Sequence, residues 1–198
     1  MSGSKLESLH QKLKDSMVKN FGGAPFLPDS ILYQILRDTD LDACLLEDGI
    51  SWVKLPANDR KTIQHGGQKL FALLAMLESK CVGLITNFIK ADQMMTGSNL
   101  DASLPFKHID DLSDILGNNV LATEFFNAQW SVTAPLFRED RSHRELRKET
   151  VLPFIEKTKI GKGVSGQVYK VTLDKRHHCL GPDSGVTDNQ VCNTVPIE

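Results

Sequence analysis

Three glycines lie close together toward the C-terminal end of this 198-residue chain. Glycine lets the backbone adopt conformations that are closed to other residues and lets it approach a phosphate group closely. Backbone N–H groups left free in such a loop then face the anion. The pattern G-x-G-x-x-G-x-V therefore predicts a phosphate-covering loop with a valine as an apolar lid over a purine. The candidate residues are Gly161, Lys162, Gly163, Val164, Ser165, Gly166 and Val168.

The residues around the glycines distinguish between kinds of nucleotide site. A dinucleotide-binding loop opens a helix, but Gln167 to Leu173 have the β-branched and aromatic composition of a strand, as do Phe154 to Ile160. A Walker loop is excluded, because no Gly-Lys-Ser or Gly-Lys-Thr triplet follows. The context favours strand–turn–strand, the arrangement found in protein kinases. An ordinary glycine-rich hairpin without a ligand is the alternative.

The segments before this loop have the periodicity of helices. Apolar residues from Ile63 to Phe88 repeat with a 4-3-4-3 spacing, which predicts one long helix over 59–90 with a bend at Gly66-Gly67. Its wide apolar face favours burial among other helices, and a surface for a protein partner is the alternative. Shorter helices are predicted after a capping-box pattern at Ser4, after Pro28, and over 41–45, 109–116 and 122–130.

Composition limits the classes of function. With 40% apolar and 24% charged residues the chain is globular, and a net charge of -2 gives no electrostatic case for nucleic acid or an anionic membrane. The longest apolar run, 70–77, is too short to cross a bilayer, and no signal peptide is evident. We therefore expect an intracellular protein of the cytoplasm or nucleus. His177, His178, Cys179 and Cys192 fit no standard zinc spacing, so we expect no metal and solvent-exposed side chains there.

The stretch from Ile160 to Val171 resembles the first two strands of a eukaryotic protein kinase. Residues upstream of it, and two histidines after it, resemble a group of fungal Ser/Thr protein kinases over roughly residues 124–178. In that family the glycines cover the phosphates of ATP, Ile160 and Val168 would bracket the adenine, and the backbone at Ser165 would approach the terminal phosphates. The residues outside the loop that carry the resemblance are Gln129-Trp130, Ala134-Pro135-Leu136-Phe137, His143, Leu152-Pro153-Phe154 and His177-His178.

The predicted helices, together with the hairpin that the resemblance implies, indicate a mainly α (α+β) fold in three parts. A helical leader domain would occupy 1–150, and a short antiparallel β-hairpin from a kinase small lobe would occupy 151–178. The polar, turn-rich segment 179–198 is expected to be a disordered tail.

The same resemblance implies that catalysis is incomplete in this sequence. Full-length relatives would transfer the γ-phosphoryl group of ATP to protein Ser or Thr with Mg²⁺, using a third-strand lysine, a catalytic Asp and metal ligands. The last lysine, Lys175, comes too early, and 191–198, where the third strand should begin, contain none. We therefore expect a truncated kinase-like protein with weak or vestigial ATP binding and no catalytic residue of its own. The alternative is a non-enzymatic helical interaction module that binds a protein partner through helix 59–90 and carries a vestigial hairpin.

Overall fold

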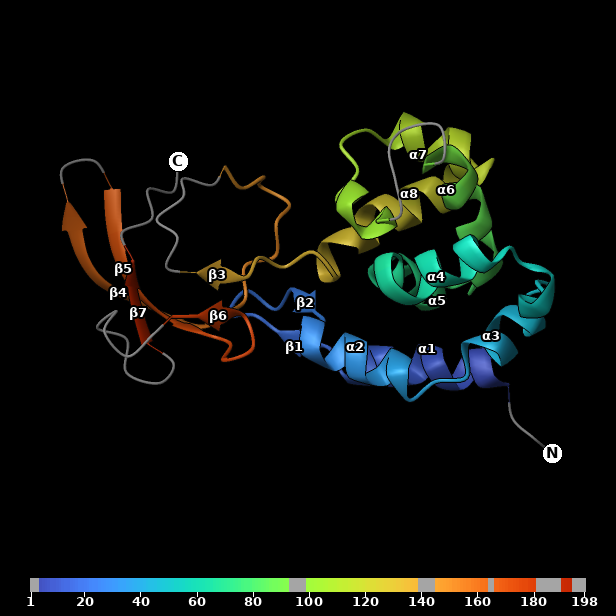
Figure 1. The fold of residues 1–198 in the computed structure, drawn as a ribbon. Helices are drawn as coiled ribbons and strands as arrows, with labels where there is room; N and C mark the ends of the chain where they lie inside the picture. The colour runs from blue at the N-terminus through green and yellow to red at the C-terminus, as the bar shows by residue number, and fades with distance from the viewer. Residues whose placement is uncertain (1–3, 93–98, 139–144, 164–165, 181–189, 194–198) are drawn as a thin grey trace.

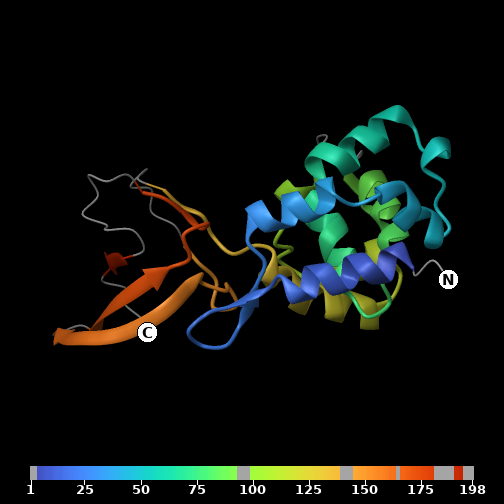
Figure 2. The same ribbon diagram turned by 90° about the horizontal axis from the view of Figure 1, so that it is seen from below.

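The fold is mainly α, with a small β part at its C-terminal end (Figure 1). The computed structural model describes residues 4–92, 99–138, 145–163, 166–180 and 190–193. Two perpendicular views show the helices gathered in one body and the β4–β5–β7 sheet extending to one side of it (Figures 1 and 2). No helix among the described residues is long and apolar enough to cross a membrane.

Eight α-helices and four short 3₁₀ helices build the described part of the helical body. Local chemistry sets several of their ends: the Ser4 hydroxyl accepts a hydrogen bond from the Glu7 N–H at 3.0 Å, and Gly117 ends α7 with a φ of 65°. The elements are α1 Lys5–Asp15, α2 Asp29–Arg37, α3 Leu41–Glu47, η1 Trp52–Lys54, α4 Ala57–Gly66, α5 Gln68–Met76, η2 Val82–Leu84, α6 Ile85–Asp92, η3 Leu100–Ser103, α7 Ile109–Leu116, α8 Asn119–Ala128 and η4 Gln129–Ser131.

The prediction of one long helix over 59–90 is wrong. The chain leaves the helical conformation at Gly67, where φ is -134°, and α5 begins at the next residue. A distant side chain caps the new helix, because the Asp101 carboxylate accepts hydrogen bonds from the N–H groups of Lys69 and Leu70, both at 3.0 Å. Packing is also close at this position, since a Cβ at position 67 would lie 3.2 Å from a methyl carbon of Leu100. Beyond α5, extended backbone at Leu77 separates α5 from α6.

The apolar residues of this segment form the centre of the hydrophobic core. Every residue from Leu70 to Leu77 is at most 6% exposed, and Leu74 is fully buried. The helices α1, α2, α6 and α8 all pack against α5, which lies inside the helical body. The face that the partner-binding alternative assigned to helix 59–90 is therefore part of the core.

The predicted antiparallel hairpin is present. Strand β4 (Phe154–Gly163) pairs with β5 (Gly166–Leu173), with Gly163 opposite Gly166. The other edge of β5 pairs with β7 (Gln190–Asn193), also antiparallel. These four residues fall within the tail that we expected to be disordered; an unpaired strand edge offers backbone donors and acceptors that can order such a segment. The rest of the tail beyond Leu180 lies outside the described residues.

Short strands attach the hairpin to the helical body. The segment between α1 and α2 forms β1 (Val18–Lys19) and β2 (Pro25–Phe26), and further along the chain β3 (Phe137–Arg138) pairs in parallel with β6 (His178–Cys179). The Phe21 N–H donates to the Phe154 carbonyl at 2.8 Å, and the Asn20 amide donates to the Leu152 carbonyl at 3.2 Å. The hairpin therefore docks on the helical segment, through residues 20–26 of the chain.

Candidate functional site

The predicted phosphate-covering residues lie at the closed end of the β4–β5 hairpin. Gly161 pairs with Val168 and Lys162 with Gln167, while Ile160 lies at a register irregularity of β4 and is 57% exposed. Lys162 is also exposed. Val164 and Ser165, between the two strands, lie outside the described residues. The structure thus brings together Ile160, the three glycines and Val168 at the tip of one ribbon.

The fold itself does not require glycine at two of these positions. A Cβ at Gly161 would make an ordinary contact of 3.9 Å with Val168, and a Cβ at Gly166 would meet nothing within 4 Å. Neither residue has a positive φ. Open space over Gly166 is where a ligand can approach the backbone, so packing within the protein gives no reason for glycine there.

The base of the sheet is packed, in contrast to its tip. Val171 and Leu173 of β5 are buried with Phe154 of β4 in a small second core. Lys157 lies between two rings, with its ammonium 4.8 Å from the centroid of Phe21 and 4.1 Å from that of Tyr169. The contact with Phe21 links β4 to the α1–α2 segment, and both rings stabilise the Lys157 ammonium group through cation–π interactions.

His177 fixes the end of the hairpin to the helical body. We expected it to be exposed, but only 1% of its surface is accessible and its ring meets the buried Phe26 ring edge-on at 5.1 Å. Its Nδ1 lies 3.3 Å from the Pro135 carbonyl, which can only accept, so Nδ1 carries the proton. The buried Nε2 then holds a lone pair with no hydrogen-bond partner. Protonation would place an unpaired N–H and a charge at this buried atom.

The attachment through His177 should weaken in mild acid. Burial lowers the pKa of His177 below 6.5, despite the opposing effects of the Pro135 hydrogen bond and of Asp174 and Asp29, with Lys69 lowering it further. The unfolded state then binds the proton more readily, so stability is lost as the pH falls below about 6.5 and levels off below the folded-state pKa. We expect the protection factors of the β4 and β5 amides, which correct for slower intrinsic exchange at lower pH, to fall between pH 7.5 and 5.5, and this pH response to disappear in His177→Phe. A response that persists in the variant would assign it to another group.

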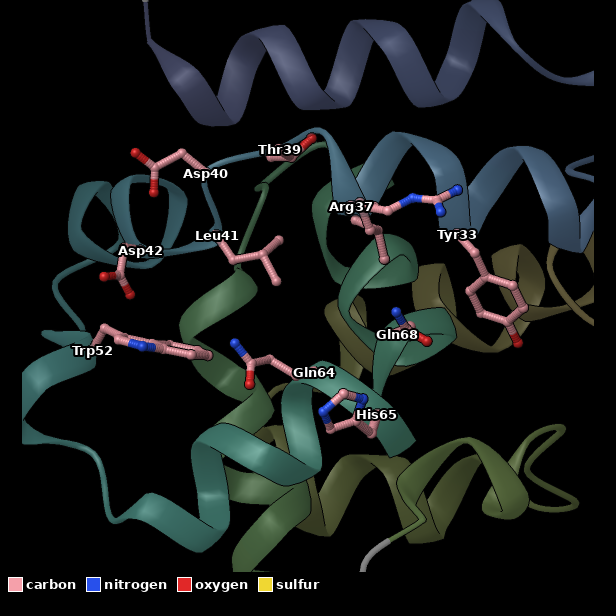
Figure 3. Close-up of a pocket in the computed structure, with 11 residues that line it drawn as sticks. Tyr33, Arg37, Thr39, Asp40, Leu41, Asp42, Trp52, Gln64, His65 and Gln68 are labelled. Carbon is pink, nitrogen blue, oxygen red and sulfur yellow. The ribbon is translucent and has the colours of Figure 1, made fainter.

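A second candidate site, which the sequence did not suggest, is a hollow of about 670 Å³ on the helical body (Figure 3). Tyr33 and Arg37, one turn apart on α2, form one side, and Gln64 and Gln68 at the α4–α5 joint form the other. Trp52 of η1 closes one end, with its ring directed toward Gln64. The remaining lining residues are Leu36, Thr39, Asp40, Leu41, Asp42 and His65.

The polar side chains of this hollow are largely free to meet a ligand. Within the part of the chain that the structure describes, no hydrogen bond or ion pair occupies the side chains of Arg37, Trp52, Gln64 or Gln68. Burial, together with Asp29 and Asp101, raises the pKa of Tyr33 to about 12, so its hydroxyl stays protonated at neutral pH and can donate. In the sequence these residues form two pairs at i, i+4 spacing, Tyr33 with Arg37 and Gln64 with Gln68. No sequence pattern relates one pair to the other.

Comparisons of the chain with models of protein families, with curated proteins and with solved structures find no match. Within the described ranges, no three His, Cys, Asp or Glu side chains are grouped so that they could hold a metal ion. The chemistry that the chain can support is therefore argued from the hairpin tip and from the hollow.

Proposed function

We propose that this chain holds the helical leader and the start of the small lobe of a protein kinase, and that its glycine hairpin covers the phosphates of ATP. The open space over Gly166, at the tip of an antiparallel ribbon, is the observation that carries the proposal. Ile160 and Val168 are the apolar residues that would bracket the adenine. In protein kinases the γ-phosphoryl group of ATP passes to a protein Ser or Thr with Mg²⁺ bound. The setting would be intracellular, in the cytoplasm or nucleus.

The position of β7 supports this proposal. It pairs with the free edge of β5, beside the second strand, where the resemblance places the third strand of a small lobe. Its sequence, Gln190-Val191-Cys192-Asn193, carries no lysine. An ATP-binding lysine is one of the groups that hold the phosphates in this family. We therefore propose that the chain binds ATP weakly and does not catalyse the transfer by itself.

A glycine-to-alanine pair separates ligand binding from folding. Gly166→Ala should leave the free energy of unfolding within about 1 kcal/mol of the native value, because the new methyl group meets nothing. The same methyl group occupies the space needed by a phosphate and should weaken binding of a fluorescent Mg-ATP analogue at least about tenfold, which corresponds to about 1.4 kcal/mol of lost contact.

The matched control is Gly22→Ala, whose new Cβ would make an ordinary 3.4 Å contact with Asn20 and lies outside the glycine loop. It should bind the Mg-ATP analogue as the native chain does. No binding to the native chain, or equal binding to the native chain and Gly166→Ala, would remove the nucleotide from this hairpin.

A further inference from the structure

The hollow between α2 and the α4–α5 joint has the shape of a surface groove. Tyr33, Arg37, Gln64 and His65 are exposed, and Trp52 and Gln68 are half-buried. A volume of about 670 Å³ falls in the range of sites that take small molecules or a few residues of peptide. An occupant would lie along the protein surface with part of its own surface in water, which suits an extended chain better than an enclosed metabolite.

The charges at the two ends of the groove are opposite. Asp42 lies near Trp52 with Asp40 beyond it, where its carboxylate also accepts a hydrogen bond from the Ala43 N–H, and Arg37 lies on the side of Tyr33 (Figure 3). Desolvation and the neighbouring Asp40 charge both raise the pKa of the exposed Asp42, with Arg60 opposing them, so a cation at this end would relieve the repulsion between the two carboxylates. The guanidinium of Arg37, free of any protein partner among the described residues, suits a carboxylate at the other end.

The groups between the two ends suit a peptide backbone. Gln64 and Gln68 each offer an N–H donor and a carbonyl acceptor, the pairing that an extended peptide presents in return. The Trp52 ring and the Leu41 side chain give an apolar wall for one side chain of the occupant (Figure 3).

We propose that this groove binds an extended segment of another protein that carries an acidic residue and a basic residue on either side of an apolar one. The acidic side chain pairs with Arg37, the basic one with Asp40 and Asp42, and the apolar one covers Trp52. This site is separate from the glycine hairpin and does not depend on ATP.

The full chain can be tested with end-capped three-residue peptides that have glutamate and lysine at opposite ends, in both orders, and one leucine between them. We expect saturable quenching of tryptophan fluorescence by at least one of the two orders. Trp52→Phe should abolish the signal, because the other tryptophan, Trp130, is only 7% exposed. The same peptide with glutamine at both ends should bind at least about fivefold more weakly.

Arg37→Gln should weaken binding of the charged peptide about fivefold, the upper range for one exposed ion pair. Arg147→Gln makes the same change at an exposed position outside the groove and should have no effect. Circular dichroism should be unchanged in both variants, because both arginines are exposed. The proposal would be overturned if neither charged peptide quenches the fluorescence. It would also be overturned if the uncharged peptide binds as tightly as the charged one, or if Arg37→Gln binds the charged peptide as tightly as the native chain does. Quenching by adenosine monophosphate without quenching by the peptides would assign the groove to a nucleotide and would also overturn it.

Discussion

Replacing Leu74 by alanine should lower the free energy of unfolding by about 2–5 kcal/mol. The side chain is fully buried in α5, so the change removes apolar contacts and leaves a cavity in a core that other helices enclose. Urea denaturation followed by circular dichroism measures the loss. The expected slope of the transition is unchanged, because the folded state keeps its extent of buried surface.

The matched control is Leu46→Ala on α3, where the leucine is 64% exposed. This variant should change the free energy of unfolding by less than about 0.5 kcal/mol. A pair of variants with equal stability would restore the interpretation of segment 59–90 as a surface for a partner, because Leu74 would then have to be outside the core.

Replacing Asp174 by alanine should loosen the turn that follows β5 and lower the free energy of unfolding by about 2–3 kcal/mol. The carboxylate is only 5% exposed and accepts hydrogen bonds from the backbone N–H, Nε and Nη2 of Arg176. Removing it leaves the Arg176 guanidinium, which is 29% exposed, without its partner. This partial exposure places the loss below the 3–5 kcal/mol typical of a fully buried pair. Hydrogen exchange should quicken in β4 and β5 and remain slow in α5.

The effect of Asp174 should depend on pH in a defined direction. Burial favours the neutral carboxyl, but the hydrogen bonds and charge of Arg176 outweigh it and lower the pKa of Asp174 below 3.8. The stabilisation is therefore complete above about pH 3.8 and is lost as the pH falls through the lower folded-state value. The difference between the native chain and Asp174→Ala should shrink over that range. Asp38→Asn, a charge loss at an exposed residue of the helical body, should give the same hairpin protection factors as the native chain at every pH.

Patterns within a few residues of one another predicted much of this fold. The Ser4 cap, the helix over 109–116 and the strand–turn–strand around the glycines all depend on neighbours in sequence, and each is present. The break at Gly67 was placed as a bend, because the carboxylate that caps α5 comes from Asp101, about 30 residues away. A periodic apolar pattern continues across such a break, since both helices face the same core.

The candidate sites show the same difference between features set by neighbouring residues and features set by residues distant in sequence. The glycine ribbon could be found in the sequence because its residues are consecutive. The groove could not, because Arg37, Trp52 and Gln64 reach it from three separate elements. The burial of His177 was missed for a similar reason: its neighbour Phe26 comes from the other end of the chain.

The attachment of the sheet also sets an order of events during synthesis. Asn20 donates a hydrogen bond to the Leu152 carbonyl, 132 residues later in the chain. The ring contact between Phe26 and His177 joins residues that are still farther apart in sequence. At ribosomal speeds of about 5–20 residues per second, the α1–α2 segment spends several seconds or more without these partners. Throughout that interval the newly made helices have time to assemble before the contact between Phe26 and His177 can form.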